Sequence, residues 1–216
     1  MDRFAAALAQ PSLLDEMMRR PHAGEPEFVR ATLEEAMPLI LAHHYTRRRT
    51  ADPMFVFMWR YGNDPVAAAV FTAPVNRYFN PDAIELSRLV RIPDFGLPLS
   101  RFVSLCLRWL KRNTTLRFCL SYADTTVGHV GTIYQACNFI HVARSAGNSQ
   151  WRHRSTGKVV SGRSFDQQTD RDGWDRMRTG EKILYVFPLA ERRRKLLDRF
   201  GWSALPFPKP RQEEAA

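Results

Sequence analysis

Residues 121–139, SYADTTVGHVGTIYQACNF, gather side chains that can hold or transfer protons. Asp124 ends a predicted strand, where a carboxylate can act as a general base or orient a nucleophile. The same carboxylate can instead form a turn with the two threonines that follow it. Tyr134 can act as a general acid or pack on the sheet, and Ser121 can donate to a substrate or simply end the strand. A proton-transfer site and an ordinary turn both remain open from the residues alone.

Histidines supply the next candidates for the same chemistry. His44 and Tyr45 stand before a run of arginines. His44 either serves a site or interacts with the carbonyl end of a helix dipole, and we favour the site. His43 is expected on the surface. His129 either belongs to the site or only precedes the next helix.

A different chemistry would need an iron site of two histidines and one carboxylate. Its ligands would be His44, His129 and either Asp124 or Glu85. Such a site would suit attack on an unreactive carbon. The sequence has no closely spaced His-x-Asp motif to support it, and a strand glutamate such as Glu85 more commonly pairs with an arginine. Iron therefore stays a secondary hypothesis.

The stretch RIPDFGLPLS, residues 91–100, lies between a predicted strand and a predicted helix. This position often binds anions, because free backbone N–H groups and the helix dipole point out of it. We expect Ser100 to be the N-cap of the helix. The residues predicted to hold the phosphates of a cofactor are Arg91, Gly96, Ser100 and Arg101.

The charge of the chain favours a polyanionic partner, with nucleic acid first, because its 216 residues carry a formal net charge of +10. Between residues 141 and 165 there are five Lys or Arg residues and no acid. These cations can contact phosphates and a tryptophan can stack on a base, although a basic loop without a role is the alternative. The residues predicted to contact DNA are Arg47, Arg48, Trp151, Arg152, Arg154, Lys158 and Arg163.

The elements that must position these residues predict an α/β or α+β fold with a mixed central sheet flanked by helices. Apolar spacing predicts a helix over residues 27–48, and the segments 54–62 and 65–74 form a predicted hairpin with a tight turn. Further predicted strands cover residues 83–92, 115–124, 140–145 and 182–189, and further helices cover 100–113, 131–139 and 190–200.

We expect three parts along the chain. A helical arm with a linker covers residues 1–26, a catalytic domain covers 27–200, and an extended tail covers 201–216. The catalytic domain carries a basic insertion at about residues 144–180. The sequence has no run of about 18 apolar residues and no secretion signal, so no membrane segment and a cytoplasmic location are expected. Three cysteines without metal-site spacing indicate reduced, buried thiols.

The order of the predicted elements resembles the GCN5-related N-acetyltransferase fold. In that fold the loop before the third helix holds the pyrophosphate of acetyl-CoA, and a tyrosine on a later helix protonates the departing thiolate. The segment IYQACNF resembles that later helix and places Tyr134 at the tyrosine position. The usual loop is richer in glycine, whereas residues 91–100 contain one glycine and two prolines. The resemblance therefore implies acetyl-CoA or another activated acyl donor.

Several blocks in the same order resemble the phage Mu Mom-like proteins over roughly residues 28–210. The blocks are HHYTRR, ELSRLVRIPD, SYADTTVGHVGTIYQACNF and YVFPLAERRRKLL…PFPKP. The resemblance implies an enzyme that converts adenine in double-stranded DNA to N6-carbamoylmethyladenine and so protects phage DNA from host restriction, in the host cytoplasm. We hypothesise that Asp124 and His44 position or deprotonate the amine, with support from Tyr45, and that Tyr134 protonates the leaving group.

Two other functions stay open. One is a generic acyl-CoA-dependent N-acetyltransferase of a small amine or a protein. The other is a non-enzymatic DNA-binding protein on the same fold. The sequence also leaves open the identity of the donor, the DNA context and the choice between a monomer and a homodimer.

Overall fold

The computed structural model forms two compact units. Unit 1 contains Met1–Val75 and Glu85–Asn113, and unit 2 contains Asn76–Ile84 and Thr114–Ala216. The predicted N-terminal arm lies outside the described residues except for its last three, as does the end of the predicted tail. The residues that the structure describes are 24–50, 52–93, 95–147, 149–168, 171–178 and 180–209.

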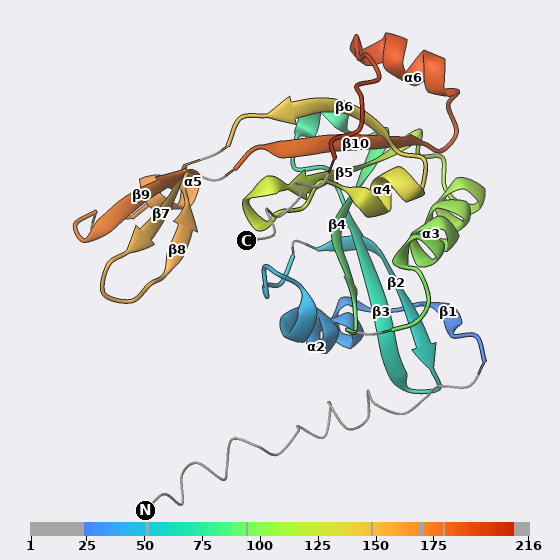
Figure 1. Cartoon of the computed structure of the whole chain (residues 1–216), viewed down its shortest axis with the longest axis horizontal. Coiled ribbons are helices and arrows are strands. Elements are labelled where there is room, and N and C mark those ends of the chain that lie inside the picture. The colour runs from blue at the N-terminus through green and yellow to red at the C-terminus, as the bar shows by residue number, and fades with distance from the viewer. Residues whose placement is uncertain are drawn as a thin grey trace, which may run out of the picture. The chain divides into compact units, whose positions relative to one another are not determined.

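Unit 1 is built on antiparallel strands in the order β1-β2-β3-β4 (Figure 1). Their bounds are β1 Glu27–Arg30, β2 Pro53–Tyr61, β3 Asp64–Thr72 and β4 Ala83–Arg91, of which the part from Glu85 onward belongs to this unit. The predicted hairpin is confirmed, because Tyr61 pairs with Asp64 across a two-residue turn in which Gly62 has a φ of 57°.

The predicted helix over residues 27–48 is wrong at both ends. Glu27–Arg30 forms an edge strand in which the Phe28 ring stacks on the Phe57 ring at 5.3 Å. The helix α2 covers Leu33–His43 and begins at the N-cap Thr32, whose hydroxyl and backbone N–H both bond to Glu35 in a capping box. The cap and the strand pairing override the helical spacing of the apolar residues.

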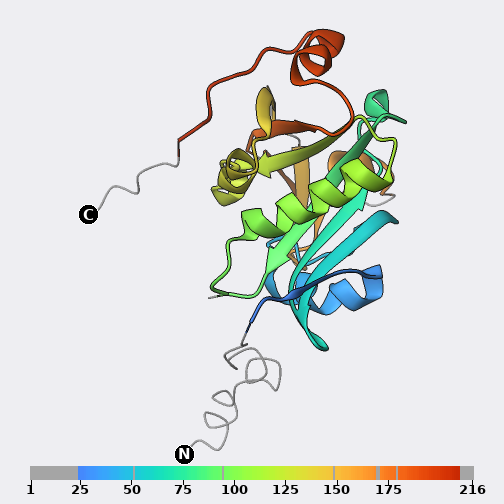
Figure 2. The same cartoon turned by 90° about the vertical axis from the view of Figure 1, so that its right-hand side faces the viewer.

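Two helices cover the opposite faces of the unit 1 strands (Figure 2). Successive strand residues face opposite sides, so Phe57 and Trp59 share one face, where they contact Trp109 and Phe102 of α3. The helix α3, Leu99–Asn113, has the predicted buried stripe of Phe102, Val103, Cys106, Leu107 and Leu110. Ser100 is not its N-cap, because the helix already begins at Leu99.

Unit 2 contains antiparallel strands in the order β5-β10-β6. These strands are β5 Phe118–Asp124, β10 Lys182–Pro188 and β6 Ile140–Ser145. One face packs into a core with the helix α6, Arg193–Phe200, through residues such as Leu120, Val186 and Leu196. Alternation along the strands places Ser121, Tyr185 and His141 on the other face.

A smaller sheet in unit 2 has the order β8-β7-β9. It lies within the predicted basic insertion and consists of β7 Ser149–His153, β8 Val159–Ser161 and β9 Trp174–Arg178, with the short helix α5 at Gly162–Asp166 beside it. The strands have only three to five residues, and β7 and β9 are mostly polar, so the sequence does not predict them.

Two expectations about the whole chain can be compared with the described residues. The three cysteines, Cys106, Cys119 and Cys137, are free and buried, as predicted. In the part of the chain that the structure describes, no helix has the length and apolar character needed to cross a membrane.

Candidate active site

A row of buried polar residues crosses the second face of the unit 2 sheet. The register pairs Tyr185 of β10 with Ser121 of β5 on one side and with His141 of β6 on the other. All three are almost completely buried. We call Ser121, Tyr185 and His141 the polar row. Buried polar groups need hydrogen-bond partners, and the partners of this row define the candidate site.

Tyr134 meets the first member of the polar row. The Ser121 hydroxyl donates to the Tyr134 hydroxyl oxygen at 2.8 Å. Tyr134 lies on α4, Thr132–Ala136, is half-buried, and packs its ring against the rings of Phe139 and Tyr185 at 5.4 and 5.3 Å. A phenol that accepts from serine can still direct its own proton toward a ligand, so the pair suits a proton donor.

Tyr185 contacts the turn that leads into α4. Its hydroxyl donates to the Val130 carbonyl at 2.5 Å, and the Gln135 side-chain amide donates to both the Tyr185 hydroxyl and that carbonyl, at 3.3 and 3.2 Å. Gly131 has a φ of 81°, and a Cβ there would lie 2.3 Å from Cε2 of Tyr185. Burial raises the pKa of the Tyr185 phenol above its ordinary value, so the hydroxyl stays protonated and continues to donate.

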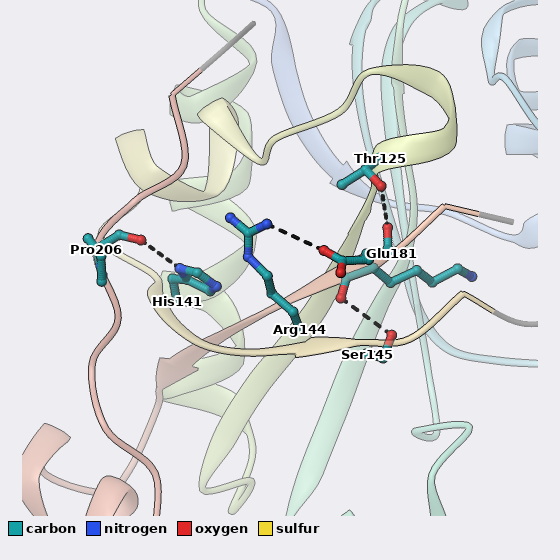
Figure 3. Close-up of polar contacts among 7 residues, drawn as sticks. Thr125, His141, Arg144, Ser145, Glu181 and Pro206 are labelled. Atoms are coloured by element: carbon teal, nitrogen blue, oxygen red, sulfur yellow. Dashed lines mark hydrogen bonds and ion pairs between the residues drawn. The ribbon is translucent and has the colours of Figure 1, made fainter.

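The described part of the C-terminal tail packs beside the third member of the polar row. His141 contacts the Pro206 carbonyl through Nδ1 at 2.8 Å, as Figure 3 shows, and its own carbonyl accepts from the Leu205 N–H. The Phe207 ring stacks with the Tyr185 ring at 6.4 Å. Because a carbonyl can only accept, Nδ1 of His141 must carry the proton. Leu205, Pro206 and Phe207 thus help to cover the polar row.

Asp124 caps the turn that follows β5. Its Oδ1 accepts from the Thr126 N–H at 2.9 Å, at the start of a 3-10 helix over Thr125–Val127. The Thr125 hydroxyl donates to the Glu181 carbonyl at 2.7 Å, and Arg144 pairs with the Glu181 carboxylate (Figure 3). The cap uses one oxygen of a half-buried carboxylate, so the structural role and the predicted catalytic role are compatible. His129 is exposed.

His44 and Tyr45 lie in unit 1, just after α2. His44 is buried, and the Tyr45 ring stacks on it at 4.5 Å while remaining 47% exposed. The Thr46 N–H donates to Nδ1 of His44 at 3.1 Å. That contact leaves the proton of the neutral imidazole on Nε2, which makes His44 a hydrogen-bond donor in this conformation. The geometry favours positioning of a ligand over removal of a proton.

A buried carboxylate and a half-buried guanidinium lie on β4 in the same unit. Glu85 accepts from the Val75 N–H at 3.1 Å and is 9% exposed. Burial lowers the pKa of the Arg88 guanidinium, and the charges of Tyr45 and Glu85 partly oppose this shift. Arg88 thus shares an electrostatic environment with both Tyr45 and Glu85.

The predicted phosphate loop is held by its own arginine. Arg91 donates to the carbonyls of Phe95 and Leu97 at 2.9 and 3.1 Å. Arg101 forms an ion pair with Glu25 at 2.8 Å. The first turn of α3 has no acidic residue, and Gly96 is exposed. The start of α3 therefore keeps the electrostatic character that suits an anion, while the arginines already have internal partners.

The predicted iron ligands gain no support. Over the described ranges, no three His, Cys, Asp or Glu side chains gather in a way that could hold a metal ion. His44 and Glu85 lie in unit 1, and Asp124 and His129 lie in unit 2.

The predicted DNA-contact residues of unit 2 divide into packed and exposed ones. The Trp151 ring stacks on the ring of Phe165 in α5 at 3.8 Å, so one of its faces is covered by that helix. Arg154 pairs with Asp175 at 2.8 Å. Arg152 and Lys158 are exposed and have no acidic partner among the described residues. Arg163 lies in α5.

In unit 1, Arg47 and Arg48 are both exposed, on the segment after α2. Arg47 adopts a left-handed backbone with a φ of 44°. The neighbouring Arg49 pairs with Glu34 at 3.0 Å. Arg49 is exposed as well, so burial does not separate the predicted DNA contacts from the arginine beside them.

Four residues that lie at the candidate sites of the two units are not among the site residues predicted from the sequence. Tyr185 and His141 left a signal, because each is a polar residue at an inward position of an apolar strand. The sequence gives no such signal for Gln135, since its role depends on a hydrogen bond to the backbone carbonyl of Val130. The four are Arg88, Gln135, His141 and Tyr185.

Comparison with known proteins gives a family and a fold. The profile of the Mom protein family matches residues 27–209. A search of curated proteins finds no match.

The solved structures that resemble the chain include several acetyltransferases. An N-acetyltransferase from Staphylococcus aureus has 15% identity and a TM-score of 0.50, covering 77% of this chain and 99% of its own. A probable acetyltransferase from Staphylococcus epidermidis has 8% identity and a TM-score of 0.51, covering 75% and 98%. A Bacillus subtilis acetyltransferase, solved in complex with CoA, has 13% identity and a TM-score of 0.46, covering 76% and 98%. The predicted α/β fold of the GCN5-related N-acetyltransferase type is confirmed.

Replacing Gly131 with Ala tests the contact between the turn and Tyr185. Gly128→Ala is the matched control, because Gly128 also has a positive φ, 74°, but a Cβ there would meet nothing within 4 Å. We expect Gly128→Ala to lower the free energy of unfolding by about 1–2 kcal/mol. Gly131→Ala should cost roughly 1–3 kcal/mol more, because the ring must move. Urea denaturation of both variants measures the difference, and equal losses would contradict the contact.

Proposed function

Because the chain belongs to the Mom protein family, we propose that it is a transferase that modifies adenine in DNA. The product we propose is N6-carbamoylmethyladenine, which would protect phage DNA from host restriction. The family match over residues 27–209 is the observation that carries this proposal. The acetyltransferase-type fold supports group transfer as the class of reaction.

The pair of Tyr134 and Ser121 supports a proton donor in unit 2. In the proposed mechanism, Tyr134 gives its proton to the leaving group, and the Ser121 hydroxyl stabilises the phenolate that forms. The contact between the two hydroxyl groups is already 2.8 Å long. Asp124 keeps one carboxylate oxygen outside its turn contact and would orient the exocyclic amine of adenine and accept the proton that this amine loses.

For His44 and Tyr45, which lie in unit 1, we propose a role in positioning a ligand. The backbone contact at Nδ1 fixes the neutral ring as a donor through Nε2, so we assign His44 a positioning role rather than that of a base. Tyr45 stacks on the imidazole and would hold its orientation.

An activated acyl donor such as acetyl-CoA is the proposed cofactor. The groups that would hold its phosphates are the backbone N–H groups of Gly96 and Ser100 at the start of α3, because the first turn of this helix contains no acidic residue of its own. Arg91 and Arg101 would reach the same phosphates only by leaving their present partners. When bound, the donor would supply an activated two-carbon group together with its amide nitrogen, because transfer of an acetyl group alone would give N6-acetyladenine. The chain supplies orientation and the proton for the leaving group.

Double-stranded DNA is the proposed partner. The net charge of +10 and the exposed cations Arg152 and Lys158 favour a phosphate backbone. An enzyme that acts on the N6 amine must take the base out of the duplex. Trp151 is half-buried with one face covered, so it suits the framework of the small sheet better than a stacking role.

A generic N-acetyltransferase of a small amine or a protein is the competing function, which the fold alone would equally suit. It has no need of a basic surface. Activity that is insensitive to salt and independent of DNA would favour it.

Expression in bacteria followed by mass spectrometry of the digested DNA nucleosides tests the proposed function. We expect a modified deoxyadenosine heavier by one carbamoylmethyl group. Tyr134→Phe should reduce its amount by at least about a hundredfold, because a general acid contributes that much to a rate. Tyr78→Phe is the matched control, since Tyr78 is 72% exposed and lies outside the candidate site. Unmodified DNA at high expression of the wild-type protein would reject the function.

Salt-dependent DNA binding distinguishes exposed cations from neutralised ones. Arg152→Ala should weaken binding to a duplex and reduce the slope of log K against log salt by about one, because one phosphate contact is lost. Arg154→Ala should change the slope less, since Asp175 already neutralises Arg154 at 2.8 Å. Fluorescence anisotropy of a labelled duplex over a salt series measures both variants. A larger change in slope for Arg154→Ala would refute this assignment.

A further inference from the structure

Tyr185 occupies the centre of the polar row and has no exposed surface. Its hydroxyl donates to the Val130 carbonyl and accepts from the Gln135 amide, so one phenol contacts both the turn before α4 and α4 itself.

The helix that carries Tyr134 is too short to be stable without contacts to the rest of the protein. α4 has five residues, and its N-cap is Gly131, which makes no side-chain cap hydrogen bond. Helices this short are unstable in isolation, because nucleation costs more than so few hydrogen bonds return. The position of α4 must therefore depend on contacts with the sheet. Tyr185 of β10 makes two of these contacts, with the Val130 carbonyl and the Gln135 amide.

The ring of Tyr185 occupies the space that a side chain at Gly131 would need. Any Cβ at residue 131 would lie 2.3–2.8 Å from the ring and hydroxyl atoms of Tyr185, and the left-handed backbone there suits glycine. The turn therefore rests directly on the ring. The register then places Ser121 beside Tyr185 in the sheet, under Tyr134.

We propose that Tyr185 is a positioning residue, which holds the start of α4 so that the Tyr134 hydroxyl meets the Ser121 hydroxyl. The inference rests on the proposed function for its catalytic meaning, but the geometry stands independently. The raised pKa of Tyr185 agrees with this role, because a phenol that stays neutral remains a donor to the Val130 carbonyl. Tyr185 is too buried to give its proton to a ligand.

Tyr185→Phe tests the proposal, because it keeps the ring and removes only the hydroxyl. With 3-fluorotyrosine placed at position 134, we expect the single fluorine resonance of the parent protein to shift and to broaden or split in Tyr185→Phe, since Tyr134 gains alternative positions. In cells with matched protein levels, modified deoxyadenosine should fall about ten- to hundredfold, because a small misplacement is costly to a rate. The anisotropy affinity for a duplex should stay unchanged.

Two further variants keep the test decisive. Gln135→Leu removes the second contact with the same carbonyl and should move the fluorine resonance in the same direction. Tyr122→Phe is the matched control on the opposite face of β5 and should leave the resonance in place. An unchanged resonance in both Tyr185→Phe and Gln135→Leu would overturn the proposal. A changed resonance in a protein that never modifies DNA would reject the proposed function and leave the positioning role supported.

Discussion

The absence of a side chain at residue 131 is the constraint on which the candidate site of unit 2 depends. Only with glycine there can the ring of Tyr185 lie directly under the turn, because a Cβ would come within 2.3 Å of it. From that position the phenol reaches the Val130 carbonyl, and Gln135 joins the same contact. The short α4 then begins next to the polar row, and the Tyr134 hydroxyl accepts a hydrogen bond from Ser121. One backbone position therefore sets the place of the proposed acid.

Strand alternation and turn chemistry made much of this fold predictable. Apolar residues that alternate along the sequence predict the hairpin of β2 and β3 and the strands β4, β5, β6 and β10. Apolar residues that recur about every three and a half positions predict the buried stripe of α3. The edge strand Glu27–Arg30 did not follow. Its apolar residues fit a helix equally well, and its pairing with β2 depends on residues about thirty positions away. Local spacing cannot encode that partner.

The candidate site was predictable in its residue types and less so in its connections. Tyr134, Ser121 and Asp124 were predicted from their chemistry, and the first two do meet. Tyr185 and His141 are polar residues within apolar strands. Their polarity indicates that they are unusual, but it does not predict which groups they contact. The contact of Gln135 with Val130 arises only when the turn folds onto β10. Side chains that position others are hidden from the sequence because their partners are backbone atoms.

The two tyrosines of this site show how surroundings divide one chemistry into two roles. Both carry the same phenol, and their rings pack at 5.3 Å. Tyr134 is half-buried and receives a hydrogen bond from a serine, which stabilises negative charge on its oxygen. Tyr185 is fully buried and donates to a carbonyl, and burial raises its pKa. A proton donor must be reachable and must tolerate the charge that it leaves behind, whereas a positioning group must keep its proton. Tyr134 meets the first pair of conditions and Tyr185 the second, so the roles that we propose rest on burial and hydrogen bonding rather than on residue type.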